Sequence, residues 1–285
     1  ASLAADVEPL FRRDRYIPSE KALLSRVGGR CERDGTALEF DPTRPDNHRC
    51  PACGTTFRGA WHHRAWVTWY QLWLAERSVR AALLYELGGD ERHATLARNI
   101  LRAYADRYLS YPNRDNVLGP TRLFFSTYLE SIWLLQICIA TDLLEHAGDH
   151  ATAERVRERI VEPSSALIAG FDEGLSNRQA WNNAALLAAA PLRGDAKAAE
   201  ACIHGRSGLH GLLTHGLLED GTWYEGENYH QFAFRGLWYG VMLCEASGRT
   251  IPPEAIDRFQ RGFLAPFLSA LPDFTMPSRK DSQYA

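Results

Sequence analysis

The fold is indicated most clearly by the segment YLESIWLLQICIATDL, which runs from Tyr128 to Leu143. Its apolar residues recur at the i, i+3, i+4, i+7 spacing of an amphipathic helix. The segment WVTWYQLW, from Trp66 to Trp73, places its aromatic residues at the same spacing. Both segments therefore predict helices with one buried face.

The same helical period continues over most of the chain after residue 60. It predicts further helices over residues 91–108, 150–171, 177–190, 196–218, 229–246 and 253–268. Glycine and proline residues separate these segments, and no stretch after residue 60 alternates as a strand would. Short connections favour antiparallel helical hairpins. Because the hairpins show no literal repeat at a fixed period, we predict an all-α body of the α/α toroid type rather than a regular solenoid.

Composition limits the classes of function. The 285 residues, 45% of them hydrophobic, are enough for one large domain with an appendage. A net charge of -3 provides no basic field for nucleic acid. The longest apolar stretches, such as Ile132 to Ala140, are shorter than the roughly 20 residues that cross a bilayer. We expect neither a nucleic-acid partner nor a membrane partner.

Residues 27–60 have a different composition, rich in Gly, Pro, Asp and Cys, and predict a small knuckle or ribbon. Cys50-Pro-Ala-Cys53-Gly54 is a zinc half-site, and Cys31 supplies a third thiolate. Asp34, in a C-x2-D-G echo of that half-site, or His48 supplies the fourth ligand. We predict structural zinc here. Three unmetallated thiols, or a zinc ribbon that binds nucleic acid, are the alternatives.

The remaining cysteines, Cys138, Cys202 and Cys244, lie singly in apolar helical segments and are expected to be buried thiols. We therefore predict no disulfide scaffold. Reduced thiols beside a metal site favour a cytoplasmic location over a secreted or periplasmic one.

Polar side chains gather at the predicted start of the helix after residue 176. The segment Ser176-Asn-Arg-Gln-Ala-Trp-Asn-Asn183 places Ser176 as the N-cap and Asn177, Arg178, Gln179 and Asn182 in the first turns. The N–H groups of a helix start suit a bound carboxylate. The alternative is a well-capped helix end in solvent.

A second polar segment, EDGTWYEGENYH, runs from Glu219 to His230. Asp220-Gly221 predicts a turn, and the aromatic pair Trp223 and Tyr224 follows it. On its own, such a pair is more often a loop anchor than a surface for sugars.

The D-G-x-x-x-E-x-x-x-Y-H pattern from Asp220 to His230 resembles that of heparinase II/III-like polysaccharide lyases and related alginate lyases. The segment from Ser176, the segment from Arg122 to Ser131 and the knuckle before Trp61 are also similar to parts of this family. The resemblance covers residues 27–282. It implies an incomplete (α/α) toroid over residues 61–271, with residues 1–26 as its first helical segment. It also implies that residues 272–285 connect to a C-terminal β-sandwich domain, without which we expect this piece to be weakly active or inactive.

The resemblance implies β-elimination in an acidic polysaccharide that contains uronic acid. Asn177, helped by Arg178, Gln179 or Asn182, would neutralise the uronate carboxylate, as an oxyanion hole does. Tyr229 would take the C5 proton and protonate the leaving oxygen. His230 is a second base, a residue that orients the tyrosine, or a core histidine. Further substrate contacts are expected from Arg122, Trp223, Tyr224 and Glu225.

The sequence departs from relatives in which a histidine follows the neutralising asparagine, because Arg178 stands there. Arginine binds a carboxylate but is no base at neutral pH, so the proton transfer would depend on Tyr229. Two other functions remain open. A hydrolase would use two of the carboxylates Asp220, Glu225 and Glu227, and a carbohydrate-binding module would use the same surface without turnover.

Overall fold

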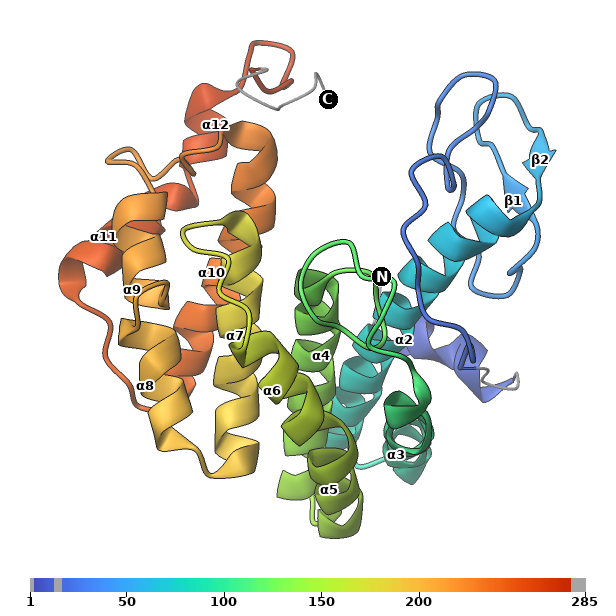
Figure 1. Cartoon of the computed structure of the whole chain (residues 1–285), viewed down its shortest axis with the longest axis horizontal. Coiled ribbons are helices and arrows are strands. Elements are labelled where there is room, and N and C mark those ends of the chain that lie inside the picture. The colour runs from blue at the N-terminus through green and yellow to red at the C-terminus, as the bar shows by residue number, and fades with distance from the viewer. Residues whose placement is uncertain (1–2, 13–16, 278–285) are drawn as a thin grey trace. The chain divides into compact units, whose positions relative to one another are not determined.

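A computed structural model of the chain describes residues 3–12 and 17–277. The chain forms two compact units, Ala1–Leu167 and Ile168–Ala285. The described residues are mostly helical and include one two-stranded sheet (Figure 1). The predicted all-α class is therefore confirmed.

Helical hairpins make up most of the first unit. Its helices are α1 (Leu3–Val7), η1 (Glu8–Phe11), α2 (Ala60–Gly88), α3 (Glu91–Arg107), η2 (Tyr108–Ser110), α4 (Thr127–His146), α5 (His150–Val156), η3 (Arg157–Val161) and α6 (Glu162–Ala169), the last of which runs past the boundary. Gly89, at φ 70°, ends α2, and the Asp90 side chain caps α3 by accepting from the Arg92 N–H. Asp149 caps α5 in the same way. These short connections produce the antiparallel neighbours expected from the sequence.

The helical segment predicted for residues 1–26 is shorter than expected. Helices α1 and η1 end at Phe11, residues 1–2 and 13–16 lie outside the described residues, and residues 17–26 contain no helix. Here the backbone N–H of Ala22 donates to the Leu123 carbonyl at 2.9 Å. The buried Lys21 ammonium donates to three backbone carbonyls and to Asn116. These bonds hold the stretch extended along the loop before α4.

Helix α4 is the core helix of the first unit. Trp133 is fully buried there and stacks on Tyr108, with ring centroids 5.6 Å apart. Among the described residues, α4 alone is long and apolar enough to cross a membrane by length and composition, but 72% of that window is buried inside the protein. Such burial is typical of a core helix.

The second unit contains α7 (Asn177–Arg193), α8 (Ala196–His204), α9 (Leu209–Gly211), η4 (Leu212–Gly216), α10 (Glu227–Ala246), α11 (Pro253–Gly262) and α12 (Ala265–Ser269). The helix predicted over 196–218 is interrupted after His204, because the chain folds back tightly at Gly205 and Gly208. A Cβ at Gly205 would lie 2.3 Å from the Ala201 carbonyl oxygen. The helix predicted over 253–268 likewise ends at Gly262, where a Cβ would meet the Phe234 ring at 2.3 Å.

Helices α7 and α10 pack side by side and run in the same direction. The Asn177 amide near the start of α7 bonds to Glu225, just before α10. One turn on, the Trp181 indole donates to the Phe232 carbonyl at 3.0 Å. At Gly236, a Cβ would lie 3.1 Å from that of Ala180. The first turns of both helices therefore lie at the same end of the second unit.

Residues 28–59 form the predicted knuckle, a loop-rich segment before α2. Strands β1 (His48–Arg49) and β2 (Thr56–Phe57) pair antiparallel. An isolated antiparallel bridge also joins Arg30 and Ala37. Of the predicted connector, residues 272–277 contain no helix or strand, and residues 278–285 lie outside the described residues.

Candidate functional site

The start of α7 forms as the sequence predicts. Ser176 has extended backbone angles, and its hydroxyl accepts from the Gln179 backbone N–H at 3.1 Å. Asn177 is therefore the first helical residue, and its side chain is only 4% exposed. The cap places an asparagine amide at the mouth of a buried helix.

The Asn177 amide reaches across to the segment that precedes α10. Its Nδ2 donates to Glu225 Oε2 at 2.8 Å, and the Trp223 indole Nε1 donates to the same oxygen at 2.7 Å. Trp223 itself is fully buried. Its ring is therefore packed inside the protein and presents no face on which a sugar can stack.

Three predicted substrate contacts on α7 are joined instead to Glu173, which sequence reasoning missed. Arg178 Nε donates to Glu173 Oε2 at 2.5 Å, and Asn182 Nδ2 donates to Glu173 Oε1 at 3.3 Å. The Gln179 side-chain oxygen accepts from the Glu173 backbone N–H at 2.9 Å. The Glu173 side chain is 2% exposed, whereas that of Arg178 is 38% exposed. Arg178 thus keeps part of its side chain in solvent while its guanidinium is paired with Glu173.

Tyr229 lies in the first turn of α10, four residues after Glu225. It shares a helix face with Gly236, seven residues on, and Gly236 packs directly on α7. The ring is half-buried, and its hydroxyl forms no hydrogen bond to any residue that the structure describes. Tyr229 and the Asn177 amide therefore occupy the same end of the α7–α10 pair, and within the described ranges the phenol hydroxyl has no hydrogen-bond partner.

His230 and Tyr224 hold the same segment in place. The Trp223 backbone N–H donates to His230 Nδ1 at 3.0 Å, and His230 Nε2 donates to the Gly262 carbonyl at 3.0 Å. Burial lowers the pKa of His230. Of the three roles considered for His230, this geometry matches the core histidine. The Tyr224 hydroxyl donates to the Leu175 carbonyl at 2.8 Å, and burial, with the nearby Glu225 charge, raises the pKa of Tyr224.

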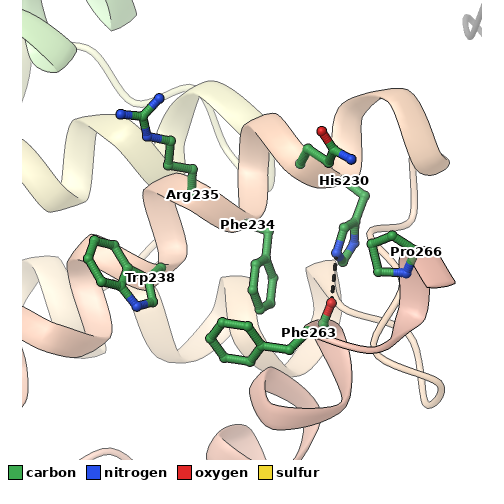
Figure 2. Close-up of a pocket in the computed structure, with 8 residues that line it drawn as sticks. His230, Phe234, Arg235, Trp238, Phe263 and Pro266 are labelled. Carbon is green, nitrogen blue, oxygen red and sulfur yellow. Dashed lines mark hydrogen bonds between the residues drawn. The ribbon is translucent and has the colours of Figure 1, made fainter. Parts of the chain in front are cut away.

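A separate cavity of about 290 Å³ lies against another side of α10. Figure 2 shows its wall formed by the His230 ring, bonded to the carbonyl beside Phe263, with Phe234, Arg235 and Trp238 along the helix. Trp238 lies nine residues, about two and a half turns, beyond Tyr229. The cavity therefore opens on a different helix face from Tyr229.

Arg122 belongs to the first unit, where its side chain is engaged with the backbone. Its guanidinium donates to the Leu109 carbonyl at 3.3 Å and to the Tyr111 carbonyl at 2.9 Å. Its backbone N–H donates to the fully buried Glu130 at 2.7 Å. Glu130 also accepts from Tyr108, Thr121, Leu123 and Ser164. Arg122 and Glu130 thus fix the loop before α4.

The knuckle brings four candidate metal ligands together. One ligand atom each from Cys31, Asp34, Cys50 and Cys53 lies within 4.8 Å of the others. The Cys31 and Cys53 sulfurs are 3.7 Å apart, close to the edge of about 3.8 Å of a tetrahedron with metal–sulfur bonds of about 2.3 Å. Three thiols and a carboxylate at this spacing can hold a metal ion.

The two halves of the cluster have the same backbone structure. The Cys31 N–H donates to the Thr36 carbonyl and the Gly35 N–H to the Cys31 carbonyl, and Cys50, Gly54 and Thr55 repeat both bonds. Gly35 and Gly54 have φ of 76° and 69°. Asp34 therefore occupies the position that Cys53 holds in the other half.

This repeat corrects one of the two predictions for the fourth ligand. His48 is buried but does not belong to the cluster, and its Nε2 has no partner among the described residues. It lies on β1, with its ring centroid 6.0 Å from that of His62.

Comparisons with known proteins agree with the motifs, although no family model matches the sequence. The chain is 25% identical over 177 residues to an exo-oligoalginate lyase of Saccharophagus degradans, a match that covers 57% of this chain and 24% of that protein. The chain resembles the heparinase and alginate lyase family. The resemblance inferred from the Asp220–His230 and Ser176 motifs is thereby confirmed.

A solved structure shows the fold of this family. The chain matches a heparinase III with methylated lysines at a TM-score of 0.50 and 17% identity, covering 79% of this chain and 36% of that one. This match confirms the expected fold class, the incomplete (α/α) toroid. The chain spans about a quarter of the exo-oligoalginate lyase and about a third of the heparinase III.

Proposed function

We propose that this chain is the helical part of a polysaccharide lyase that cleaves a uronic-acid polymer by β-elimination. The observation that carries the proposal is the placement of Asn177 and Tyr229 at the adjoining starts of α7 and α10. The exo-oligoalginate lyase and heparinase III relatives support a lyase at the level of the family. An acidic polysaccharide is the proposed substrate of this chain. The β-sandwich domain implied by the resemblance is the proposed partner of the helical part in the whole protein.

The uronate carboxylate would bind at the mouth of α7. One N–H of the Asn177 amide bonds to Glu225, which leaves the second N–H for the substrate. The partly exposed Arg178 side chain, whose Nε bonds to Glu173, would lie beside the carboxylate. Because negative charge accumulates on the carboxylate as C5 loses its proton, donors placed in advance lower the barrier.

Tyr229 would carry the proton transfer. As the base, its side-chain oxygen takes the C5 proton, the C5 electron pair forms the C4–C5 double bond, and the bond from C4 to the bridging oxygen breaks. The tyrosine hydroxyl then returns the proton to that leaving oxygen. His230 has no part in this step, because both of its ring nitrogens are bonded within the fold.

We also propose that the cluster of Cys31, Asp34, Cys50 and Cys53 binds zinc and has a structural role. Thiolates with a tetrahedral spacing are typical zinc ligands, and four protein ligands leave no open position for catalysis. The metal would join the two half-sites of a segment that has little apolar core of its own.

The decisive experiment assays the whole protein on alginate, heparan sulfate, hyaluronan and chondroitin, and follows the ultraviolet absorbance of a 4,5-unsaturated uronide. Tyr229→Phe should lower kcat by on the order of 100-fold to 10,000-fold, since it removes the acid and base. Tyr239→Phe, on the same helix, is the matched control and should retain activity.

Two outcomes would contradict the lyase. New reducing ends without the unsaturated chromophore would indicate a hydrolase. Binding of acidic oligosaccharide without turnover, unaffected by Tyr229→Phe, would indicate a binding module.

A further inference from the structure

Glu225 is joined to the candidate site through one of its oxygens. Oε2 accepts from Asn177 Nδ2 at 2.8 Å and from Trp223 Nε1 at 2.7 Å. The other oxygen accepts no hydrogen bond from the described part of the chain. A carboxylate next to the proposed binding position of another carboxylate repels it, so Glu225 is poorly suited to contact a uronate directly.

The indole that holds Glu225 is itself immobile. Trp223 is fully buried, and a Cβ at Gly216 would lie 2.3 Å from its ring, so no side chain separates the ring from that backbone. Its backbone N–H is bonded to His230, which is anchored to the Gly262 carbonyl. The position of the Glu225 carboxylate is therefore fixed by the core.

We propose that Glu225 is a positioning residue that holds the Asn177 amide in the orientation needed to neutralise the substrate carboxylate. This inference rests on the proposed function. An ionised carboxylate only accepts hydrogen bonds, so the NH2 side of the amide must face Glu225 and its oxygen must face away. With one N–H held, the direction of the second N–H is fixed as well.

Fixing the amide has a catalytic purpose. A side-chain amide that rotates freely spends part of its time with its oxygen toward the substrate, where it repels the developing negative charge. Donors that are oriented before the reaction avoid that reorganisation. The segment Trp223–His230 then acts as a support for Asn177, which explains why a core histidine and a buried tryptophan belong to the same motif as Tyr229.

The test uses steady-state kinetics of the whole protein with Glu225→Ala and Glu225→Gln. Glu225→Ala should lower kcat by about 10-fold to 100-fold with KM nearly unchanged, because the amide is still present but no longer held. Glu225→Gln should recover most of kcat, since its amide oxygen still accepts from Asn177 and Trp223, and KM should fall because a negative charge is removed. Glu219→Gln, an exposed carboxylate of the same segment, is the matched control and should behave as the wild type.

A spectroscopic readout keeps the test independent of turnover. In a 1H–15N spectrum, the Trp223 indole resonance, assigned with Trp223→Phe, should move upfield in Glu225→Ala and stay near its original position in Glu225→Gln. An unmoved indole resonance in Glu225→Ala would overturn the proposal.

Other kinetic outcomes would also overturn it. A higher KM with unchanged kcat in both variants would mean that Glu225 binds the sugar directly. Equal loss of kcat in both would mean that it transfers a proton, and wild-type kinetics in Glu225→Ala would mean that it has no role. If the wild type forms no unsaturated product on any substrate, the proposed function itself fails, whatever the variants do.

Discussion

The cysteine knuckle and the α7–α10 site are assembled in different ways. In the knuckle, each half-site is closed by hydrogen bonds between residues no more than five positions apart, from Cys31 to Thr36 and from Cys50 to Thr55. In the α7–α10 site, Asn177 and Glu225 are 48 positions apart, and Tyr224 and Leu175 are 49 apart. Local turns form one site, and helix packing forms the other.

The difference determines which errors a sequence interpretation makes. A turn that closes within six residues is visible as a repeated C-x2-C/D-G-T pattern, so the sequence predicted the three cysteine ligands and gave Asp34 as one of two candidates for the fourth. Glu173, five residues before Arg178, belongs to no recognisable turn pattern and was missed. The pairing of Glu225 with Asn177 spans 48 positions and has no local pattern either, so Glu225 was expected to contact substrate. Substitutions in the knuckle should therefore affect the knuckle itself, whereas substitutions in the α7–α10 site should affect the packing of the second unit.

The largest expected effect comes from Cys50→Ser in the knuckle. Losing one of four ligands should reduce bound zinc from about one ion per chain to little or none. The segment should then unfold, because structural zinc supplies much of the folding free energy of such segments, about 10 kcal/mol or more. Zinc content by mass spectrometry and protease sensitivity of residues 28–59 measure this. Cys244→Ala, a buried thiol outside the cluster, is the control, and full zinc content in Cys50→Ser would refute the site.

Glu173→Ala should have the next largest effect, on the second unit. It leaves the fully buried Asn182 amide without its Glu173 acceptor and removes the partner of Arg178, which should cost about 1–3 kcal/mol of unfolding free energy. Urea denaturation measures the loss, and Glu173→Gln should show a smaller one. An unchanged midpoint, equal to that of the exposed control Glu219→Ala, would show that the pairing contributes nothing.

His230 gives a smaller, pH-dependent effect. Burial lowers the pKa of His230 below its ordinary value of 6.5. As pH falls, the unfolded chain therefore binds a proton on His230 at a higher pH than the folded chain does. The neutral ring stabilises the fold above about pH 6.5, and this stabilisation is lost as pH falls through the folded pKa. The stability difference between wild type and His230→Phe should therefore shrink from pH 8 to pH 5. His48, whose pKa burial also lowers, is present in both proteins and cancels. A difference that is constant with pH would contradict this account.

The smallest expected effect separates the two candidates for the fourth ligand. His48→Gln should leave zinc content unchanged, because His48 lies outside the cluster, whereas Asp34→Ala should weaken zinc binding in a competition with a chelator. Asp34→Cys should tighten it, because thiolate is a softer donor than carboxylate. Zinc loss in His48→Gln with retention in Asp34→Ala would reverse the assignment.

Most of the helices could be predicted, and the breaks within them could not. The apolar period continues through Gly205 to Gly208, and only the close approach of the chain to the Ala201 carbonyl shows why the helix stops there. Among the site residues, the Ser176 cap and the start of α7 at Asn177 follow from local hydrogen bonding. The contacts of Arg122 with backbone carbonyls and of His230 with Gly262 depend on residues 11 to 32 positions away.

The sequence by itself determined the helical class, the two cysteine half-sites and the polar start of α7, because helix period, turn chemistry and capping act over a few residues. Only the tertiary structure decided that Asp34 joins the three cysteines in the candidate metal cluster, that Glu225 faces Asn177 and that Tyr229 lies on the side of α10 that meets α7. The physical reason is that helix packing selects side-chain partners that are distant in the chain, and that the approach of one knuckle half-site to the other brings Asp34 to the cysteines; no local pattern encodes either.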